Sequence, residues 1–220
     1  MWLKVGTSRN RKYIPVHDIF NNLPDGYHTS LPSFHALTGS DSTSFIAYHS
    51  KQTTFELFLK HHGLLDGIGK NANPPSQDVL NCAEKFVCHI YKVPHATSVD
   101  NARALLFGHC KKTEALPPTS DALNLHLMRV HYLSLIWNLA HIPKPNIPDP
   151  TCMGWKVQDK QLVPLLMTKA AIPEACLSLV ACQCKTGCRN CQCGCRKAGY
   201  QCTINCHSGN GSSLCHNNDN

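Results

Sequence analysis

Apolar side chains recur at helical spacing through most of the first 140 residues. The clearest case is the segment 76–92, whose apolar stripe consists of Val79, Cys82, Ala83, Phe86 and Ile90. Ser76 stands directly before this stripe, where a serine hydroxyl can accept one of the free N–H groups of a first helical turn. The pattern therefore predicts an amphipathic helix that begins after Ser76 and buries one face.

Further segments show the same kind of pattern and complete a mostly helical body. They are residues 30–39, 52–63, 98–108 and a longer stretch that follows the prolines at 117 and 118. We expect Pro32 in the first turn of the first helix and Gly39 at its end. Thr119 or Ser120 should cap the longest helix. The apolar face of that helix comprises Leu123, Leu127, Val130, Leu133 and Trp137.

The helical pattern stops in a proline-rich segment. Residues 141–150 contain four prolines, which favour a semi-rigid extended linker. The predicted fold class is mainly α, with a helical body followed by a loop-rich tail. We divide the chain into a remnant of a larger core (1–70), a helical segment (71–141), a proline-rich linker (142–175) and a cysteine-rich tail (176–220).

Composition and charge narrow the class of protein only moderately. The 220 residues are 42% hydrophobic and carry a formal net charge of +7, which suits an anionic partner without identifying one. No apolar run reaches the roughly 20 residues of a membrane helix, and the N-terminus lacks the features of a signal peptide. We therefore expect an intracellular protein that does not bind membranes. In a reducing compartment its thiols should not be mainly disulfides.

The cysteines are concentrated at the end of the chain. Nine of the 14 lie between residues 182 and 215, at Cys182, Cys184, Cys188, Cys191, Cys193, Cys195, Cys202, Cys206 and Cys215. Several form C-x-C pairs, which would make strained disulfides but suit two thiolates on one tetrahedral Zn²⁺ or on adjacent ions. The gaps between them contain too few apolar residues for a core, so metal would have to supply the folding energy.

The number of thiolates limits the number of ions. Nine are enough for three Zn²⁺ if some sulfurs bridge, or for two ions with one cysteine to spare. The thiolate cluster would be anionic, and four nearby cations would offset its charge while they remain available to phosphates. These cations are Lys185, Arg189, Arg196 and Lys197. The simpler alternative is a zinc-stapled loop that binds no further ligand.

Residues 182–206, "CQCKTGCRNCQCGCRKAGYQCTINC", resemble the tesmin-type CXC domain. The resemblance implies a zinc-cluster DNA-binding module in the nucleus, with about three ions. It makes six cysteines the firmer ligands, namely Cys182, Cys184, Cys188, Cys193, Cys195 and Cys202, and leaves Cys191 as an extra thiol. Ser208 replaces the last cysteine of the pattern, so His207 or Cys215 is expected to serve instead.

Two departures from the CXC pattern concern DNA rather than zinc. The family usually carries two copies of the domain, and this chain carries one. Gln192 stands where the family has a tyrosine that reaches into the minor groove. We therefore expect zinc binding together with weak, nonspecific contacts to the DNA backbone.

The first part of the chain carries a second resemblance. "WLKVGTSRNRKYIPVHDI", "LPSFHALTGSDSTSF" and "ALPPTSDALNLH", followed by the cysteine tail, are similar to a multicopy group of invertebrate proteins interpreted as derived from mobile elements. Members of that group are usually longer at the N-terminus, which suggests that this chain is a truncated copy. The first two segments also resemble the C-terminal half of a flap-endonuclease (PIN-like) core. In that family an "IP" strand end leads into a helix and then to a G-x-D motif.

The nuclease resemblance assigns one candidate metal ligand, Asp41, to the G-x-D motif. Before Glu56 the only other acidic residues are Asp18 and Asp25, whereas two-metal hydrolysis needs several converging carboxylates. Asp41 is better explained as the N-cap of a helix. We expect a non-catalytic zinc-binding protein that contacts nucleic acid. The alternatives are a decayed metal-dependent nuclease and a module for metal buffering or protein interaction.

Overall fold

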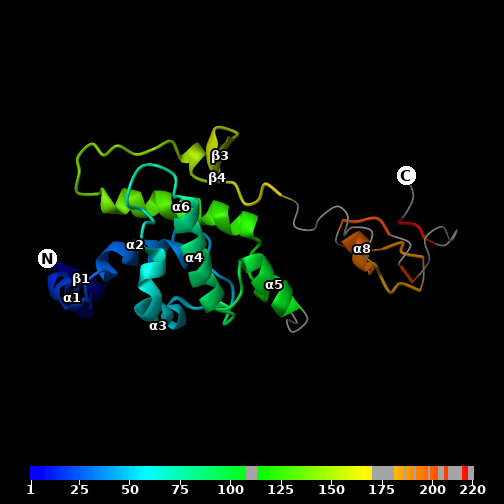
Figure 1. Ribbon diagram of the computed structural model, residues 1–220, viewed down its shortest axis with the longest axis horizontal. Helices are drawn as coiled ribbons and strands as arrows, with labels where there is room; N and C mark the ends of the chain where they lie inside the picture. Colours follow the sequence, from blue (N-terminus) through cyan, green and yellow to red (C-terminus); the bar gives the residue numbers. More distant parts are fainter. Residues whose placement is uncertain are drawn as a thin grey trace. The chain divides into compact units, whose positions relative to one another are not determined.

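The computed structural model describes residues 1–107, 113–169, 181–185, 187–190, 192–197, 199–202, 206–207 and 215–217. It divides into two units, Met1–Thr168 and Lys169–Asn220, and each is described by itself. Helices predominate in the first unit, whereas the described part of the second consists of short loops and one helical turn (Figure 1). The mainly helical class expected from the sequence is confirmed.

The chain begins with an antiparallel hairpin. β1 (Trp2–Thr7) pairs with β2 (Asn10–Pro15), so that Trp2 lies opposite Pro15. α1 (Val16–Asn22) follows directly, because Pro15 has no N–H group for further strand pairing and its fixed φ suits the start of a helix. A strand that ends in Ile-Pro therefore leads directly into a helix.

Five helices described in the first unit pack around one apolar core (Figure 1). They are α2 (Tyr27–Leu37), α3 (Lys51–His61), α4 (Gln77–Ile90), α5 (Val99–Phe107) and α6 (Ser120–Asn138), with the short 3-10 turns η1 (His62–Leu65) and η2 (Thr113–Ala115) between them. The rings of Phe34 and Phe58 lie 4.7 Å apart at the centre, and Phe86 of α4 meets Phe34 edge-on at 6.4 Å. These aromatic contacts join α2, α3 and α4 into one packed group.

The helix caps follow the sequence closely. The Ser76 hydroxyl accepts a hydrogen bond from the Val79 N–H group, and Thr119 accepts one from Ala122. Both predicted caps are confirmed. α2 differs from the expectation, since it begins at Tyr27 and contains Pro32 in its interior rather than in its first turn. A proline there removes one hydrogen bond of the helix, and α2 nevertheless stays continuous and packs against α6.

The predicted apolar faces are buried where a neighbouring helix covers them. In α4, Ala83, Phe86 and Ile90 are buried, whereas Val79 and Cys82 at its N-terminal end are partly exposed. In α6, Leu123, Leu127 and Val130 are buried. Trp137 was predicted on the same face but is 38% exposed, because the last turn of α6 extends past the core. The centroid of its ring lies 5.5 Å from that of the His35 ring in α2.

The chain after α6 folds back onto that helix. A 3-10 turn, η3 (Pro150–Cys152), leads to an antiparallel hairpin of β3 (Trp155–Gln158) and β4 (Gln161–Pro164). The Arg129 guanidinium of α6 donates from Nη1 to the carbonyls of Gly154 (3.0 Å) and Leu165 (2.6 Å). The sequence pattern predicted a linker over 142–175 and gave no sign of this hairpin.

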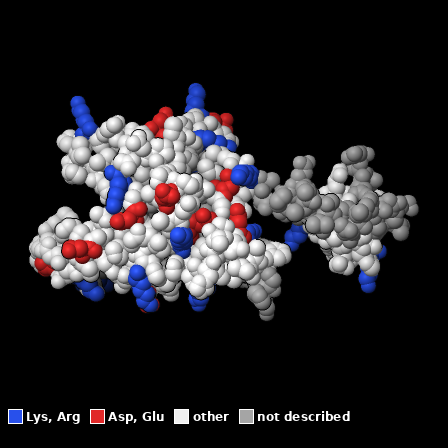
Figure 2. All heavy atoms as spheres, in the orientation of Figure 1, with Lys and Arg blue, Asp and Glu red and all other residues white. Residues whose placement is uncertain are grey.

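Charged side chains are spread over the first unit. Figure 2 shows lysines, arginines and acidic residues interspersed over the visible face of that unit. None of the described helices combines the length and hydropathy that crossing a bilayer would require.

Candidate metal centre

Tight turns bring the cysteines of the second unit together. Gly187 and Cys188 both have positive φ, 75° and 56°. Glycine reaches this conformation easily, and its place before Cys188 allows the chain to reverse within a few residues. The reversal places the Sγ atom of Cys188 3.6 Å from that of Cys182.

A single helical turn positions the next ligands. α8 (Gly194–Lys197) carries Cys195, and Gly199 ends the turn with a φ of 76°. The Tyr200 N–H group then donates to the Cys195 carbonyl over 2.9 Å. This left-handed helix end directs the following segment back toward the cluster, where Cys202 is buried.

Cysteines form the whole interior of this unit as far as it is described. Seven are buried, namely Cys182, Cys188, Cys193, Cys195, Cys202, Cys206 and Cys215, and Cys184 is half-buried against them. Among the described residues, no aliphatic or aromatic side chain belongs to this cluster. The described part of the unit therefore lacks the apolar core that would hold it together without a further group.

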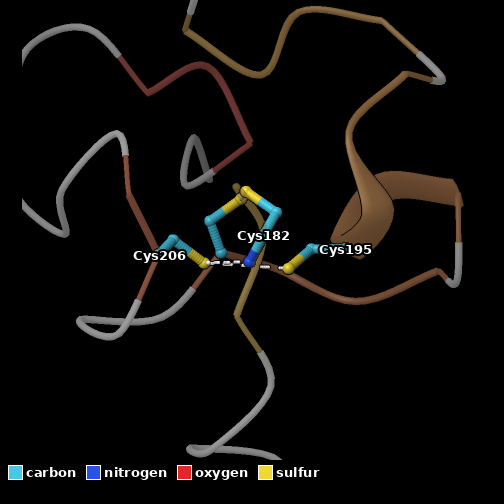
Figure 3. A group of neighbouring side chains, drawn as sticks. Cys182, Cys195 and Cys206 are labelled. Atoms are coloured by element: carbon cyan, nitrogen blue, oxygen red, sulfur yellow. Dashed lines mark hydrogen bonds between the residues drawn. The ribbon is translucent and has the colours of Figure 1, made fainter. Parts of the chain in front are cut away.

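The eight sulfurs fall into three overlapping groups, and within each group all sulfurs lie within 4.8 Å of one another. The groups are Cys182, Cys195, Cys202 and Cys206; Cys182, Cys184, Cys188 and Cys193; and Cys188, Cys202 and Cys215. Each pair of groups shares one cysteine, which is Cys182, Cys188 or Cys202. Figure 3 shows part of the first group, with the sulfurs of Cys195 and Cys206 directed toward Cys182.

The distances between sulfurs fit metal coordination better than disulfide bonds. Four pairs lie 3.6 to 3.9 Å apart, well beyond the roughly 2.05 Å of a disulfide. Four sulfurs at about 2.3 Å from a tetrahedral ion would lie about 3.8 Å from one another. The eight cysteines are therefore free thiols arranged at the spacing of metal ligands.

Burial and crowding oppose ionisation of several thiols in the absence of a cation. Burial raises the pKa of Cys195 and Cys202, and neighbouring thiols add to the effect. At Cys193 burial also acts to raise the pKa, but the Arg196 N–H group and nearby thiols donate to its sulfur and lower the pKa to about 6. A bound cation would favour the thiolate form at all of these positions.

Hydrogen-bond donors surround the sulfurs as a second layer. The Cys182 N–H group donates to the sulfur of Cys206, and the Asn217 side chain donates to Cys202, each over 3.3 Å. Such donors stabilise thiolate ligands and fix their direction. The sequence did not predict the role of Asn217, because Asn217 lies 15 residues after Cys202 and only the fold brings the two together.

The cysteines predicted as ligands are brought together wherever they are described. Cys215 belongs to the third group, whereas His207 is exposed and belongs to none of the groups. Cys191 lies outside the described residues. How the groups share cysteines was not predicted, since spacing along the chain does not reveal which sulfurs meet.

The predicted phosphate-binding residues lie at the surface of the second unit. Lys185, Arg189, Arg196 and Lys197 are all exposed. Arg196 donates from Nη2 to the His216 carbonyl over 2.7 Å, so part of its hydrogen-bonding capacity serves the fold. A hollow of about 480 Å³ beside the cysteines is lined by Arg189, Asn190 and Gln192, among others.

Asp41 lies in a different setting from the one expected. It is exposed in the turn between Ser40 and Thr43, whose backbones pair with each other. No helix begins after it within residues 38–50, and the next helix, α3, is capped by Ser50. The helix-cap interpretation of Asp41 is therefore wrong. Asp41 also belongs to none of the groups of metal-ligand side chains found among the described residues.

Comparison of the chain with protein-family models, with curated proteins and with solved structures gave no match.

Proposed function

We propose that the second unit folds around a multinuclear zinc–thiolate cluster, and that the protein is a non-catalytic zinc protein whose tail contacts nucleic acid. The observation that carries the zinc proposal is the sharing of Cys182, Cys188 and Cys202 between groups. A sulfur that lies within ligand distance of two groups can bridge two ions. Zn²⁺ accepts such all-thiolate, tetrahedral surroundings readily.

The same arrangement supports a proposal of three ions. Three tetrahedral ions need twelve sulfur contacts, and nine cysteines supply them when three of the nine bridge. The eight described cysteines account for eleven of these contacts, since the third group has three members. The sequence offers Cys191 for the remaining one. The zinc would supply closed, structural coordination, while the chain provides the turns and donors that orient the thiolates.

Zinc stoichiometry of cysteine variants tests the cluster. We expect about three Zn²⁺ per full chain by native mass spectrometry and by release to a chromogenic chelator. Cys188→Ser should lower zinc content more than Cys184→Ser, because Cys188 serves two groups and Cys184 only one. Cys152→Ser, at an exposed cysteine of the first unit, is the matched control and should leave the content unchanged.

Two results would contradict the cluster. One is a content of a single ion per chain, and the other is an equal loss of zinc in the Cys188 and Cys184 variants. Either would mean that the shared sulfurs do not bridge.

Binding to nucleic acid is supported by charge. Residues 181–217 contain no acidic residue, and the four exposed cations lie around the cysteines. Three Zn²⁺ and nine thiolates would carry a charge of about −3, which the four cations outweigh. Phosphate contacts of this kind give salt-sensitive affinity without base reading. A nuclear location would follow from this role and stays a prediction.

A gel-shift assay at two salt concentrations tests the proposed binding to DNA phosphates. We expect zinc-loaded protein to bind duplex DNA more weakly at 200 mM than at 50 mM salt. Lys185→Gln with Lys197→Gln should weaken binding and flatten its salt dependence. Lysines are chosen because Arg196 also bonds the His216 carbonyl. Lys156→Gln with Lys160→Gln, two exposed lysines of the first unit, forms the control pair.

If the protein binds about three Zn²⁺ but does not shift DNA in the gel, the remaining function is a module for metal buffering or protein interaction.

The nuclease alternative has its own test. It would be favoured if the wild type cleaves DNA with Mg²⁺ or Mn²⁺ and the Asp41→Ala variant does not. We propose no catalysis, since Asp41 has no partner ligands among the described residues.

A further inference from the structure

The first unit contains a cavity that the zinc cluster does not explain. Its volume is about 490 Å³, within the range of about 300 to 1,000 Å³ that small-molecule sites occupy. Its walls come from the loop before α3, from α4, α5 and α6, and from the chain after β4. Most of the lining is apolar, with contributions from Phe45, Ile46, Leu116, Leu123, Leu166 and Met167.

Arg129 places a buried positive charge at this cavity. The residue lines the cavity and is only 2% exposed. Both of its hydrogen bonds come from Nη1 and go to backbone carbonyls, which are neutral. Among the described residues, no carboxylate lies within ion-pair distance of its guanidinium. A buried cation without a counter-charge is costly, and an anionic group in the cavity would remove that cost.

His126 adds an unpartnered acceptor one turn before Arg129 on α6. Its Nε2 faces the Leu37 carbonyl at 3.0 Å, so this nitrogen carries the hydrogen and donates. The Nδ1 atom is then an acceptor, and it is buried with no hydrogen-bond partner. Unsatisfied buried acceptors are rare and point to a missing partner.

The remaining charged residues of the cavity leave it net positive. Arg103 donates to the Pro117 carbonyl over 2.6 Å, and Glu114 is exposed on η2. Two arginines therefore oppose one solvent-exposed carboxylate. Because guanidinium pairs with a carboxylate through parallel hydrogen bonds, a carboxylate at the end of an apolar chain suits both Arg129 and the apolar walls.

We propose that this cavity binds an amphipathic monocarboxylic acid, with its carboxylate at Arg129, a donor group near His126 and its aliphatic part against the apolar walls. This proposal stands independently of the zinc cluster, because every residue that it uses belongs to the first unit.

Calorimetric titration of the zinc-loaded full chain tests the proposal with decanoate as the probe. Decanol has the same chain without the charge, and decylamine has the opposite charge. We expect decanoate to bind about tenfold more tightly than decanol, since a charged hydrogen bond of this kind contributes that much affinity. Decylamine should bind more weakly still.

Two alanine-to-tryptophan variants, one in α6 and one just past its end, provide the structural control. Ala122 lines the cavity, and Ala122→Trp should fill it and abolish decanoate binding. Ala140→Trp adds the same side chain at an exposed position past the end of α6 and should bind decanoate like the wild type. Circular dichroism confirms that both variants fold.

Arg129→Met should remove the preference for decanoate over decanol while decanol still binds. Arg129 also donates hydrogen bonds to two backbone carbonyls, so Arg129→Met can destabilise the fold. If circular dichroism shows that this variant is unfolded, the comparison of Ala122→Trp with Ala140→Trp provides the test instead. The proposal is overturned if decanoate does not bind at millimolar concentration, if decanol binds equally well, or if Ala122→Trp leaves binding unchanged.

Discussion

At the scale of single residues, two histidines of α6 show how burial fixes a protonation state. His126 donates to the Leu37 carbonyl from Nε2. His131 donates from Nε2 to the Asn71 carbonyl and accepts the Gly69 N–H group at Nδ1. Burial lowers the pKa of both, and that of His126 falls to about 4. Both are therefore neutral parts of the helical core at neutral pH.

The lowered pKa of His126 predicts a loss of stability in acid. As pH falls below 6.5, the unfolded chain takes up a proton that the folded chain does not bind until about pH 4. The free energy of unfolding should thus decrease between these values, by up to about 3 kcal/mol from this group. His126→Gln keeps a donor for Leu37 without the titration.

Urea unfolding of wild type and His126→Gln at pH 7.5, 6 and 5 measures this difference. The wild type should lose more stability than the variant over this range. Since both proteins carry the same tail, any contribution of the cluster cancels. Parallel pH profiles would contradict the assignment of the effect to His126.

At the scale of elements, the loop after η1 is joined to α6 by a close backbone approach. The Gly69 N–H group donates a hydrogen bond to His131, and the Gly69 carbonyl accepts one from the Asn138 side chain. Its φ is +74°, and a Cβ atom there would lie 2.4 Å from the Cβ of Ser134. Only glycine fits both the conformation and the space.

Gly69→Ala should therefore destabilise the first unit by about 2 to 4 kcal/mol. Gly63→Ala is the matched control, because Gly63 is exposed and a Cβ atom there meets nothing within 4 Å. Denaturant unfolding of both variants provides the comparison. Equal stability of the two would show that α6 can move away from the loop at little cost.

The elements also differ in how well the sequence predicted them. Helix starts at Ser76 and Thr119 were correct, since a cap is a local interaction within a few residues. The β3 and β4 hairpin was missed, and its strands are mostly exposed. Its attachment depends on Arg129, which lies 25 residues before Gly154 in sequence. Sequence patterns over a few residues cannot predict a contact between residues so far apart in the chain.

At the scale of the whole molecule, the two units are stabilised by different means. The first buries a conventional apolar core, whereas the described interior of the second consists of thiols. Removal of metal should therefore affect only one of them.

A chelator under reducing conditions tests this independence. We expect zinc to leave the full chain while the far-ultraviolet helical signal of the first unit remains within error of its starting value. Loss of resonances from the tail in an NMR spectrum would report its unfolding in the same sample. A concerted loss of helical signal with zinc would contradict the division into independent units.

The sequence alone determined the helical class, two helix caps, the placement of most cysteines in one tail and their suitability for metal. These properties depend on periodicity, capping and ligand spacing, which act over a few residues. Tertiary structure alone decided that Cys182, Cys188 and Cys202 are each shared between groups. It also decided that Arg129 lines a cavity. Both features arise where segments distant in sequence meet, so the order of residues does not specify them without the fold.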